Sequence, residues 1–182
     1  MPYEIGDIVI KNDKWPGHVL MCVTAKNGRN SEKFIHATWN CNFSIDDQVE
    51  NKDGVMAYLI NDVDVHFSPS VPFSAVRKAE IVNVAERIAS TTKYGLYRAT
   101  RLLFGSKTFG SGARSRLNKY HSRLKSGIGH VVATVTCSEA VLLCHQLTSK
   151  ENELSFINLD AAHTMPRDLL EYLNSNVHWI RK

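Results

Sequence analysis

Apolar and polar positions alternate in short runs along the first third of the chain, a period typical of strands. Asn-Gly, Asp-Gly and Asn-Asp pairs separate these runs and favour turns. The Asn27-Gly28 pair predicts a hairpin whose loop is longer than the tightest turns allow. We expect five strands, at Ile5–Ile10, His18–Thr24, Lys33–Trp39, Gly54–Ile60 and Val63–Phe67.

A helical pattern replaces this alternation after the proline-containing break at Ser68–Pro72. Ser74 is a suitable N-cap for a helix, because apolar residues follow it at helical spacing. Thr91-Thr92 predicts the end of that helix. The further elements expected here are a helical run over Tyr94–Phe104, a flexible glycine-containing stretch over Gly105–Gly112 and a basic helix at about Arg114–Leu124.

The last third of the chain combines short extended runs with helices. Val131–Val135 is an extended run that leads directly into Cys137, and a helix is expected over Cys137–Gln146. Pro166 opens the next helix, since proline is tolerated in a first helical turn. Val177–Ile180 is expected to close the sheet as its last strand.

These elements predict an α+β fold in which an antiparallel β-sheet packs against helices. The helix that begins at Cys137 follows the sheet in the chain. At 182 residues, the chain suits one domain with a sizeable core. We therefore expect a single domain over 1–182, in which residues 68–128 form a helical, basic insert or lid.

The composition is that of an ordinary globular protein, with 43% hydrophobic and 22% charged residues. No apolar run reaches the roughly 18 residues of a membrane-spanning helix, so no transmembrane segment is expected. Residues Met1–Asp7 lack the basic and apolar regions of a secretory signal, which predicts synthesis in the cytoplasm without a signal peptide. The four cysteines form no CxxC pair, so we expect no metal site and no cofactor.

Positive charge is concentrated in one part of the chain. Residues 77–125 hold 12 of the 22 lysines and arginines but only two acids, Glu80 and Glu86. Such a stripe either contacts an anionic surface or partner, or consists of solvated helix faces. We favour solvated faces, and we expect no specific recognition of nucleic acid.

A cysteine and two histidines occupy positions suited to nucleophilic catalysis. Cys137 would lie in a first helical turn, where the helix dipole and unbonded N–H groups lower the pKa of a thiol and can bind an oxyanion. His18 and His36 fall in consecutive predicted strands, so their imidazoles would lie side by side if these strands are neighbours. One imidazole would then act as base and the other would orient it.

Each of these residues also has a structural interpretation. A single histidine in a strand is more often a half-buried, hydrogen-bonded residue than a base. A single cysteine at a helix start is more often part of the core, and we assign Cys144, two turns deeper on the same face, to the core. Residue spacing alone therefore leaves catalysis and packing both open.

The histidine-bearing strands resemble those of NlpC-type cysteine peptidases, papain-like enzymes that commonly cleave peptide bonds in bacterial cell-wall stem peptides. The segments that carry the resemblance are Gly6–Ile10, Gly17–Met21 and Lys33–Thr38. The resemblance implies that His18 is the base and that His36, in a Phe-Ile-His-Ala strand, is the third catalytic residue. It implies that Cys137, in a Thr-Cys-Ser helix start, is the nucleophile.

The order of these residues resembles the circularly permuted branch of that superfamily, because Cys137 follows the histidines. This branch includes bacterial amidase-like proteins, secreted effectors and the lecithin:retinol acyltransferase group, and Met165–Leu170 resembles the proline-led segment that follows its cysteine helix. Two features depart from the common pattern: Ala25–Glu32 lengthens the hairpin loop, and Glu139 replaces a glycine. Thr136–Ala140 does not match the acyltransferase motif, so we rank hydrolysis above acyl transfer.

The resemblance implies a permuted papain-like fold and a cysteine hydrolase that cleaves amide bonds through a thioester, with peptidoglycan stem peptides as the first substrate to test. Two alternatives are a permuted-fold acyltransferase or lipase that touches an anionic membrane through residues 77–125, and a non-catalytic binding domain with a basic helical face. By analogy with antibacterial effectors, a dedicated secretion system would export the protein to a target periplasm. An immunity or inhibitor protein would then be a partner.

Overall fold

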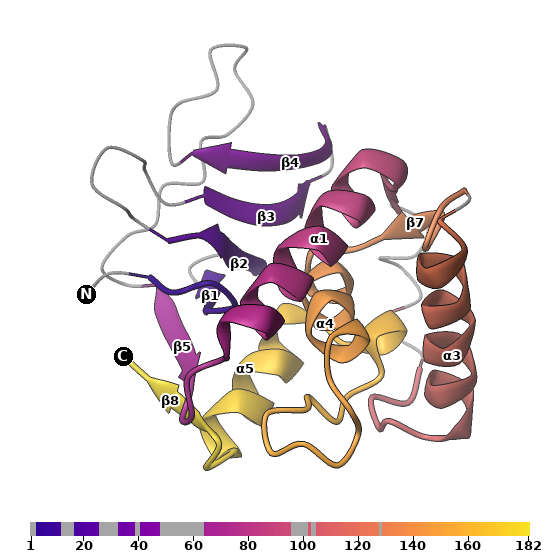
Figure 1. Ribbon diagram of the computed structural model, residues 1–182. Helices are drawn as coiled ribbons and strands as arrows, with labels where there is room; N and C mark the ends of the chain where they lie inside the picture. Colours follow the sequence, from indigo (N-terminus) through magenta and orange to yellow (C-terminus); the bar gives the residue numbers. More distant parts are fainter. Residues whose placement is uncertain are drawn as a thin grey trace.

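Helices gather on one side of an antiparallel sheet, so the fold is α+β, as the sequence predicts (Figure 1). Both chain ends lie near the sheet, because its strands come from the N-terminal half and from the last residues of the chain. The computed structural model describes residues 3–11, 17–25, 33–38, 41–47, 64–95, 102, 105–127 and 129–182.

Six described strands form the main sheet, and every neighbouring pair in it is antiparallel. The spatial order of the strands is β4-β3-β2-β1-β5-β8. Their bounds are β1 (Ile8–Lys11), β2 (His18–Thr24), β3 (Lys33–Thr38), β4 (Cys41–Asp47), β5 (Val65–Pro69) and β8 (Trp179–Arg181).

The strand predictions hold where apolar residues dominate. The bounds of β2 agree with the prediction, and β8 closes the sheet beside β5, as expected for the last strand. β4 was not predicted, because its sequence contains two aspartates and only one β-branched residue, Ile45. The strand predicted over Gly54–Ile60 lies outside the described residues.

The α-helices that the structure describes are α1 (Ala75–Thr91), α3 (Ser111–Ser126), α4 (Cys137–Leu147) and α5 (Pro166–Ser175), and a 3-10 turn, η1 (Ala161–His163), precedes α5. Ser74 caps α1 as predicted, by accepting a hydrogen bond from the N–H of Arg77. α1 ends at the predicted threonine pair, where the N–H of Thr92 bonds to the carbonyl of Ile88. α3 ends at Gly127, whose φ of +66° lies in the left-handed region.

The predicted helical run over Tyr94–Phe104 begins differently. Lys93–Tyr94 form strand β6, which pairs in parallel with β7 (Thr134–Val135). Most of the remaining residues of that run lie outside the described part of the chain. The extended segment predicted before Cys137 is confirmed by β7.

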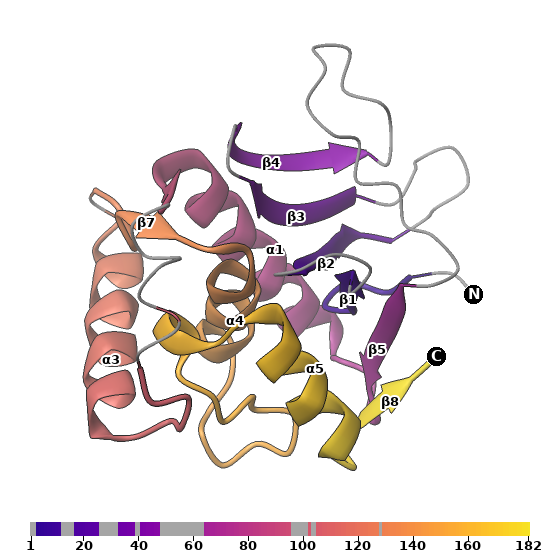
Figure 2. The same cartoon turned by 180° about the vertical axis from the view of Figure 1, so that it is seen from behind.

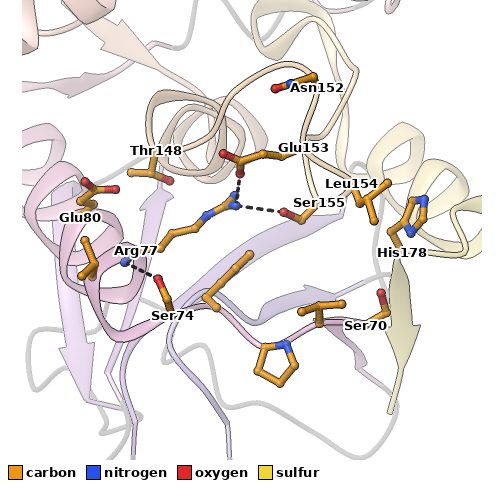
Figure 3. A pocket seen from close by; sticks show the side chains of 14 residues that line it. Ser70, Ser74, Arg77, Glu80, Thr148, Asn152, Glu153, Leu154, Ser155 and His178 are labelled. Atoms are coloured by element: carbon orange, nitrogen blue, oxygen red, sulfur yellow. Dashed lines mark hydrogen bonds and ion pairs between the residues drawn. The ribbon is translucent and has the colours of Figure 1, made fainter.

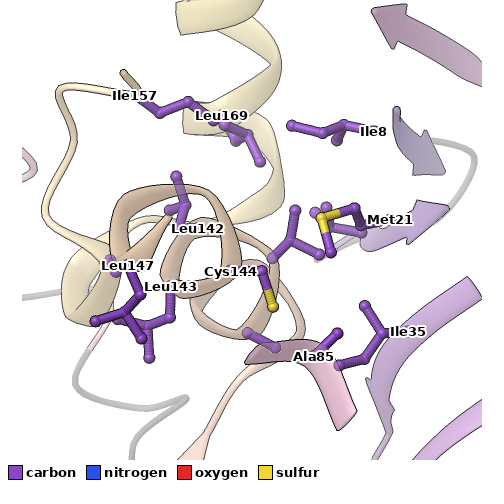
Figure 4. Close-up of a cluster of buried hydrophobic side chains, with 14 of the residues drawn as sticks. Ile8, Met21, Ile35, Ala85, Leu142, Leu143, Cys144, Leu147, Ile157 and Leu169 are labelled. Carbon is purple, nitrogen blue, oxygen red and sulfur yellow. The ribbon is translucent and has the colours of Figure 1, made fainter. Parts of the chain in front are cut away.

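α4 lies at the centre of the molecule. It packs on β2 and β3, and it lies between α1, which is in front in Figure 1, and α5, which is in front in Figure 2. All of its residues are buried, whereas we expected only one buried face. Cys144 is completely buried among apolar side chains, which confirms its assignment to the core (Figure 4).

The segment 68–128 takes part in the main core. α1 buries Ile81, Val84, Ala85 and Ile88. α3 (Ser111–Ser126) contributes three buried residues from one helix face, Ala113, Leu117 and Tyr120. α1 packs directly on α4 and on β2 and β4. α1 and α3 are therefore a structural layer of the domain. A role as a lid for the other residues of 68–128 stays a prediction.

No described helix combines the length and the apolar composition needed to cross a bilayer. Within the described part of the chain, no three histidine, cysteine or acidic side chains are grouped as a metal site requires.

Candidate active site

Cys137 is the first residue of α4. Thr136 caps this helix, because its side chain accepts a hydrogen bond from the N–H of Glu139 (3.3 Å). The first backbone bond of the helix joins the N–H of Ala140 to the carbonyl of Thr136. The N–H groups of Cys137 and Ser138 therefore precede the helical ladder, and both lie close to the sulfur. Two such groups at a helix start can stabilise an oxyanion.

Burial decides the state of the Cys137 thiol. The residue is only 7% exposed, and burial raises the pKa of Cys137 above its ordinary value. Backbone N–H groups of Val19, Ser138 and Cys137 itself act in the opposite direction but do not outweigh burial. The prediction that the helix dipole lowers this pKa is wrong, because the dipole acts on a side chain that has lost its water. The thiol is protonated at neutral pH.

His18 and His36 form a pair across β2 and β3. Nε2 of His18 lies 3.3 Å from Nδ1 of His36, and the two rings meet edge-on with their centroids 5.4 Å apart. This arrangement confirms that the strands are neighbours and that the imidazoles lie side by side. One nitrogen of the pair must donate while the other accepts, so each ring fixes the tautomer of the other.

His18 is electrically neutral at physiological pH. Burial lowers the pKa of His18 to about 3, and repulsion from His36 and Lys11 acts in the same direction. A neutral imidazole is the form that a general base requires. Cys137 and His18 therefore form a neutral thiol and a neutral imidazole, not an ion pair.

The histidine pair and Cys137 lie on opposite faces of the sheet. Side chains alternate along β2, and Val19 and Met21 belong to the core that contains α4, so His18 points to the other face. Cys137 Sγ reaches the N–H of Val19, which is one residue from His18. His18 is the first residue of its strand, so its side chain and Cys137 Sγ both lie at this end of β2, on opposite faces of the sheet. Among the described residues, no hydrogen bond joins Cys137 Sγ to either imidazole.

A second buried histidine array was not anticipated from the sequence. His66 Nε2 lies 2.7 Å from Asp7 Oδ2 and 3.4 Å from Ser68 Oγ. Both contacts fall on the same ring nitrogen, whereas a serine nucleophile and its orienting acid need opposite nitrogens of the base. The array is therefore a buried polar pair that holds β1 to β5. Its members lie 59 residues apart, and no local spacing could have indicated the contact.

A hollow of about 530 Å³ lies between the β5–α1 connection and the loop over 152–155 (Figure 3). Exposed apolar side chains of Val71, Val76 and Leu154 line it, and Arg77 crosses it to reach Glu153. None of the three candidate catalytic residues lines this hollow. It is therefore separate from the surroundings of Cys137.

Much of the positive charge in residues 77–125 is neutralised inside the molecule. Five of its described basic residues form ion pairs with carboxylates elsewhere in the chain: Arg77–Glu153, Lys78–Glu4, Lys107–Asp168, Arg114–Glu151 and Arg116–Asp160. Arg87 and Arg123 donate to backbone carbonyls. This pairing favours helix faces that are stabilised internally over a surface that attracts an anionic partner.

Comparison of the chain with protein-family models, with curated proteins and with solved structures finds no match.

Proposed function

We propose that the protein is a cysteine hydrolase of amide bonds, with Cys137 as nucleophile, His18 as base and His36 as the group that orients the base. The observation that carries this proposal is the 3.3 Å contact between His18 Nε2 and His36 Nδ1, one residue from the N–H that reaches the sulfur. Because Nε2 of His18 faces His36, Nδ1 is the nitrogen that would receive the thiol proton. A base held on one side by an orienting group is the arrangement that activates a nucleophile.

The proposed reaction starts from the neutral pair. The S–H proton of Cys137 moves to Nδ1 of His18, and the sulfur electron pair forms a bond to the amide carbonyl carbon. The N–H groups of Cys137 and Ser138 stabilise the oxygen that becomes negative. The C–N bond then breaks while His18 gives its proton to the departing nitrogen, which leaves a thioester.

Water completes the cycle. His18 takes a proton from the water while the water oxygen attacks the thioester carbonyl carbon. The C–S bond breaks, the sulfur recovers the proton from His18, and the acyl part leaves as a carboxylic acid. The net reaction consumes one water and one amide, and it needs no metal ion or redox partner.

Proton transfer within the resting pair is unfavourable. The pKa of Cys137 is raised and that of His18 is lowered to about 3, so a thiolate–imidazolium pair is costly in the empty site. Catalytic hydrogen bonds are often long without substrate and shorten when it binds. We therefore infer that substrate binding brings Nδ1 of His18 to Cys137 Sγ and supplies the oxyanion contacts.

The proposed substrates are peptide bonds of peptidoglycan stem peptides, within a permuted papain-like fold. Both parts of this proposal derive from the resemblance to NlpC-type cysteine peptidases, which is carried by the Gly17-His18, Phe34–Ala37 and Cys137 segments. An antiparallel sheet in which every described strand except β8 precedes the cysteine-bearing helix in the chain supports the proposed fold. Acyl transfer at an anionic membrane receives no comparable support, because five of the described basic residues that would touch the membrane are paired with carboxylates of the chain.

The test is digestion of purified muropeptides, followed by mass spectrometry. Wild-type protein is expected to yield a shorter peptide and a new amino terminus, and Cys137→Ala is expected to reduce the rate by at least about 100-fold. Cys144→Ala is the matched control, since it removes a second buried thiol from the same helix. Equal rates for wild type and Cys137→Ala would overturn the proposal. Acyl transfer to added lipid in place of hydrolysis would assign the alternative activity.

A further inference from the structure

One short segment between η1 and α5 touches the neighbours of both proposed reacting residues. Ser138, which follows Cys137, donates from Oγ to the carbonyl of Thr164 (2.5 Å). Pro166, two residues later, packs against Gly17, the residue before His18. A Cβ placed on Gly17 would lie 3.1 Å from Pro166 Cβ. Since two residues of chain span at most about 7 Å, a single segment determines both contacts.

Gly17 allows this close approach. Its φ of +82° lies in the left-handed region that favours glycine. A Cβ at this position would also lie 3.0 Å from the carbonyl oxygen of Lys11. A side chain at residue 17 would therefore be strained by this φ, and the Lys11 carbonyl and Pro166 would have to give by a few tenths of an ångström. The glycine before the proposed base is a packing requirement of the Pro166 contact.

The segment is held firmly at both ends. Thr164 is completely buried, and its Oγ1 donates to the carbonyl of Asp160 (2.7 Å). The N–H of Met165 donates to Asp168 Oδ2 (2.9 Å), and the ring of Pro166 fixes its own φ. Few rotations remain between Thr164 and Pro166, so a displacement of one contact is transmitted to the other.

α3 reaches the same segment through Arg116. The guanidinium of Arg116 pairs with Asp160 Oδ2, which also lies 2.8 Å from Nδ1 of His163. Asp160 Oδ1 accepts a hydrogen bond from the N–H of Ala162 (3.1 Å), which closes the turn before Thr164. The carboxylate of Asp160 is only 8% exposed, so this ion pair is less screened than one in open solvent.

We propose that Thr164–Pro166 is a positioning element that sets the separation of Cys137 and His18, and that Arg116 supports it through Asp160. The inference rests on the proposed roles of Cys137 and His18. No hydrogen bond joins their side chains in the described structure, so the two groups must come closer for the proposed proton transfer, and the position of this segment would determine how close they come. Loss of the Arg116–Asp160 pair would then lower the rate of the chemical step and leave substrate affinity unchanged.

The measured quantity is the dependence of Cys137 reactivity on His18. Iodoacetamide alkylation of Cys137 is followed by peptide mass spectrometry at pH 7.5, with and without His18→Ala in the same background. The alkylation rate with His18 present, divided by the rate with His18→Ala, gives a coupling factor. A change in the exposure of Cys137 that affects both proteins equally cancels in this ratio. We expect a factor of about 10 or more in wild type, because general-base assistance is typically worth at least that much.

Arg114→Ala and Arg116→Ala form a matched pair on α3. Each removes one arginine–carboxylate pair, but Arg114 pairs with Glu151, which is exposed and is not part of the segment. We expect Arg116→Ala to reduce the coupling factor to below 3, Arg114→Ala to leave it unchanged, and Arg116→Lys to restore it in part. Ser138→Ala acts directly on the Thr164 contact and keeps the test decisive if Arg116→Ala does not fold.

Two failures are distinguishable. A wild-type coupling factor near 1 would reject the Cys137–His18 pair and with it the proposed function. A factor of 10 or more that persists in both Arg116→Ala and Ser138→Ala would reject the positioning element alone and leave the proposed function standing. On muropeptides, the positioning element predicts a lower kcat at constant KM for Arg116→Ala, whereas a purely structural role predicts a lower yield of folded protein at constant kcat.

Discussion

The imidazole of His18 meets that of His36 edge-on, with Nε2 and Nδ1 3.3 Å apart, at the first residue of β2. Both rings are buried, and the next N–H along the strand reaches Cys137 Sγ. A surface histidine pair would exchange partners with water, but this pair is held between two strands of the sheet. The contact with His36 therefore sets the tautomer of the proposed base before substrate binds, and its approach to Cys137 follows on binding.

Removing the ring of His36 should cost activity more than stability. His36→Ala leaves His18 without the group that fixes its tautomer, so we expect kcat for amide hydrolysis to fall by roughly 10- to 100-fold. His36→Gln keeps a polar atom close to His18 and should retain more activity than His36→Ala. Steady-state kinetics on muropeptides checks this order. Equal kcat for His36→Ala and wild type would contradict the orienting role.

The rate of hydrolysis should not fall on the acid side of pH 6.5, as it does in enzymes whose base is an ordinary histidine. An ordinary histidine titrates near pH 6.5, but burial lowers the pKa of His18 to about 3. The base is therefore neutral and active throughout the range from pH 5 to 8. We expect log kcat/KM to change by less than about 0.5 between pH 5 and 7.5. A drop of tenfold per pH unit centred near 6.5 would show that the free enzyme carries an ordinary histidine as its base.

The sequence predicts elements well where one local signal is sufficient. Ser74 begins α1 at the expected place, and β2 has the expected bounds, because caps and β-branched runs act over a few residues. The histidine pair follows from two such strands becoming neighbours. These features depend on contacts between residues that lie close together in the chain.

The features that the sequence did not predict depend on burial and on distant contacts. The raised pKa of Cys137 reflects a helix that is buried on every side, whereas its sequence indicated one buried face. The contact of Pro166 with Gly17 joins residues far apart in the chain, as does that of Asp7 with His66. Neither has a local pattern, so only the folded arrangement shows it.

His145 should make the protein less stable in acid. Among the described residues its ring nitrogens have only a weak backbone interaction with Gly6, and the ring packs against Phe73 and Trp179. Burial lowers the pKa of His145 to about 3, and repulsion from Arg77 adds to this effect, while attraction to Asp7 and the backbone of Gly6 oppose it without outweighing it. Between pH 6.5 and 3 the unfolded chain binds a proton that the folded chain does not bind. Stability therefore decreases as pH falls through this range.

The measurement is urea unfolding of wild type and His145→Phe at pH 7.5 and pH 5. The phenyl ring keeps the packing and removes the titration, so the stability lost between these pH values should be smaller by about 2 kcal/mol in the variant. The lowered pKa of His18 also makes the protein less stable as pH falls through this range, but His18 is present in both proteins, so its effect cancels in the comparison. An unchanged pH dependence in His145→Phe would mean that this ring is protonated in the folded state.

Asp7 should contribute to stability at neutral pH. Burial raises the pKa of Asp7, but hydrogen bonds from His66, Ser68 and the N–H of Glu4 outweigh it, so the pKa is lowered on balance. The contribution is present above the unfolded value near 3.8 and is lost as pH falls through the lower folded value. We expect Asp7→Asn to cost about 2–4 kcal/mol at pH 7, because it leaves His66 without its charged partner.

Glu4→Gln is the matched control for Asp7→Asn. Glu4 pairs with Lys78, but its side chain is 55% exposed, so this substitution should cost less than about 1 kcal/mol. Chemical unfolding at pH 7 compares the two variants. Similar losses for both would mean that the buried array of Asp7 and His66 contributes no more than a surface pair.

Gly17→Ala should damage both stability and the proposed site. Its φ of +82° disfavours any side chain, and a Cβ there would be crowded by Lys11 and Pro166. Gly129→Ala is the matched control, since its φ of +69° carries the same backbone penalty but no described atom other than those of its chain neighbours lies within 4 Å of the added carbon. The backbone penalty alone is about 1–2 kcal/mol.

We therefore expect Gly129→Ala to lose about 1–2 kcal/mol of unfolding free energy and to keep full hydrolytic activity. Gly17→Ala should lose more, because the Lys11 carbonyl and Pro166 must also give way to the added carbon. That movement displaces His18 from Cys137, so kcat should fall by at least about tenfold in the fraction of protein that remains folded. Equal unfolding free energies and equal kcat for the two variants would show that the contact of Gly17 with Pro166 does not position the base.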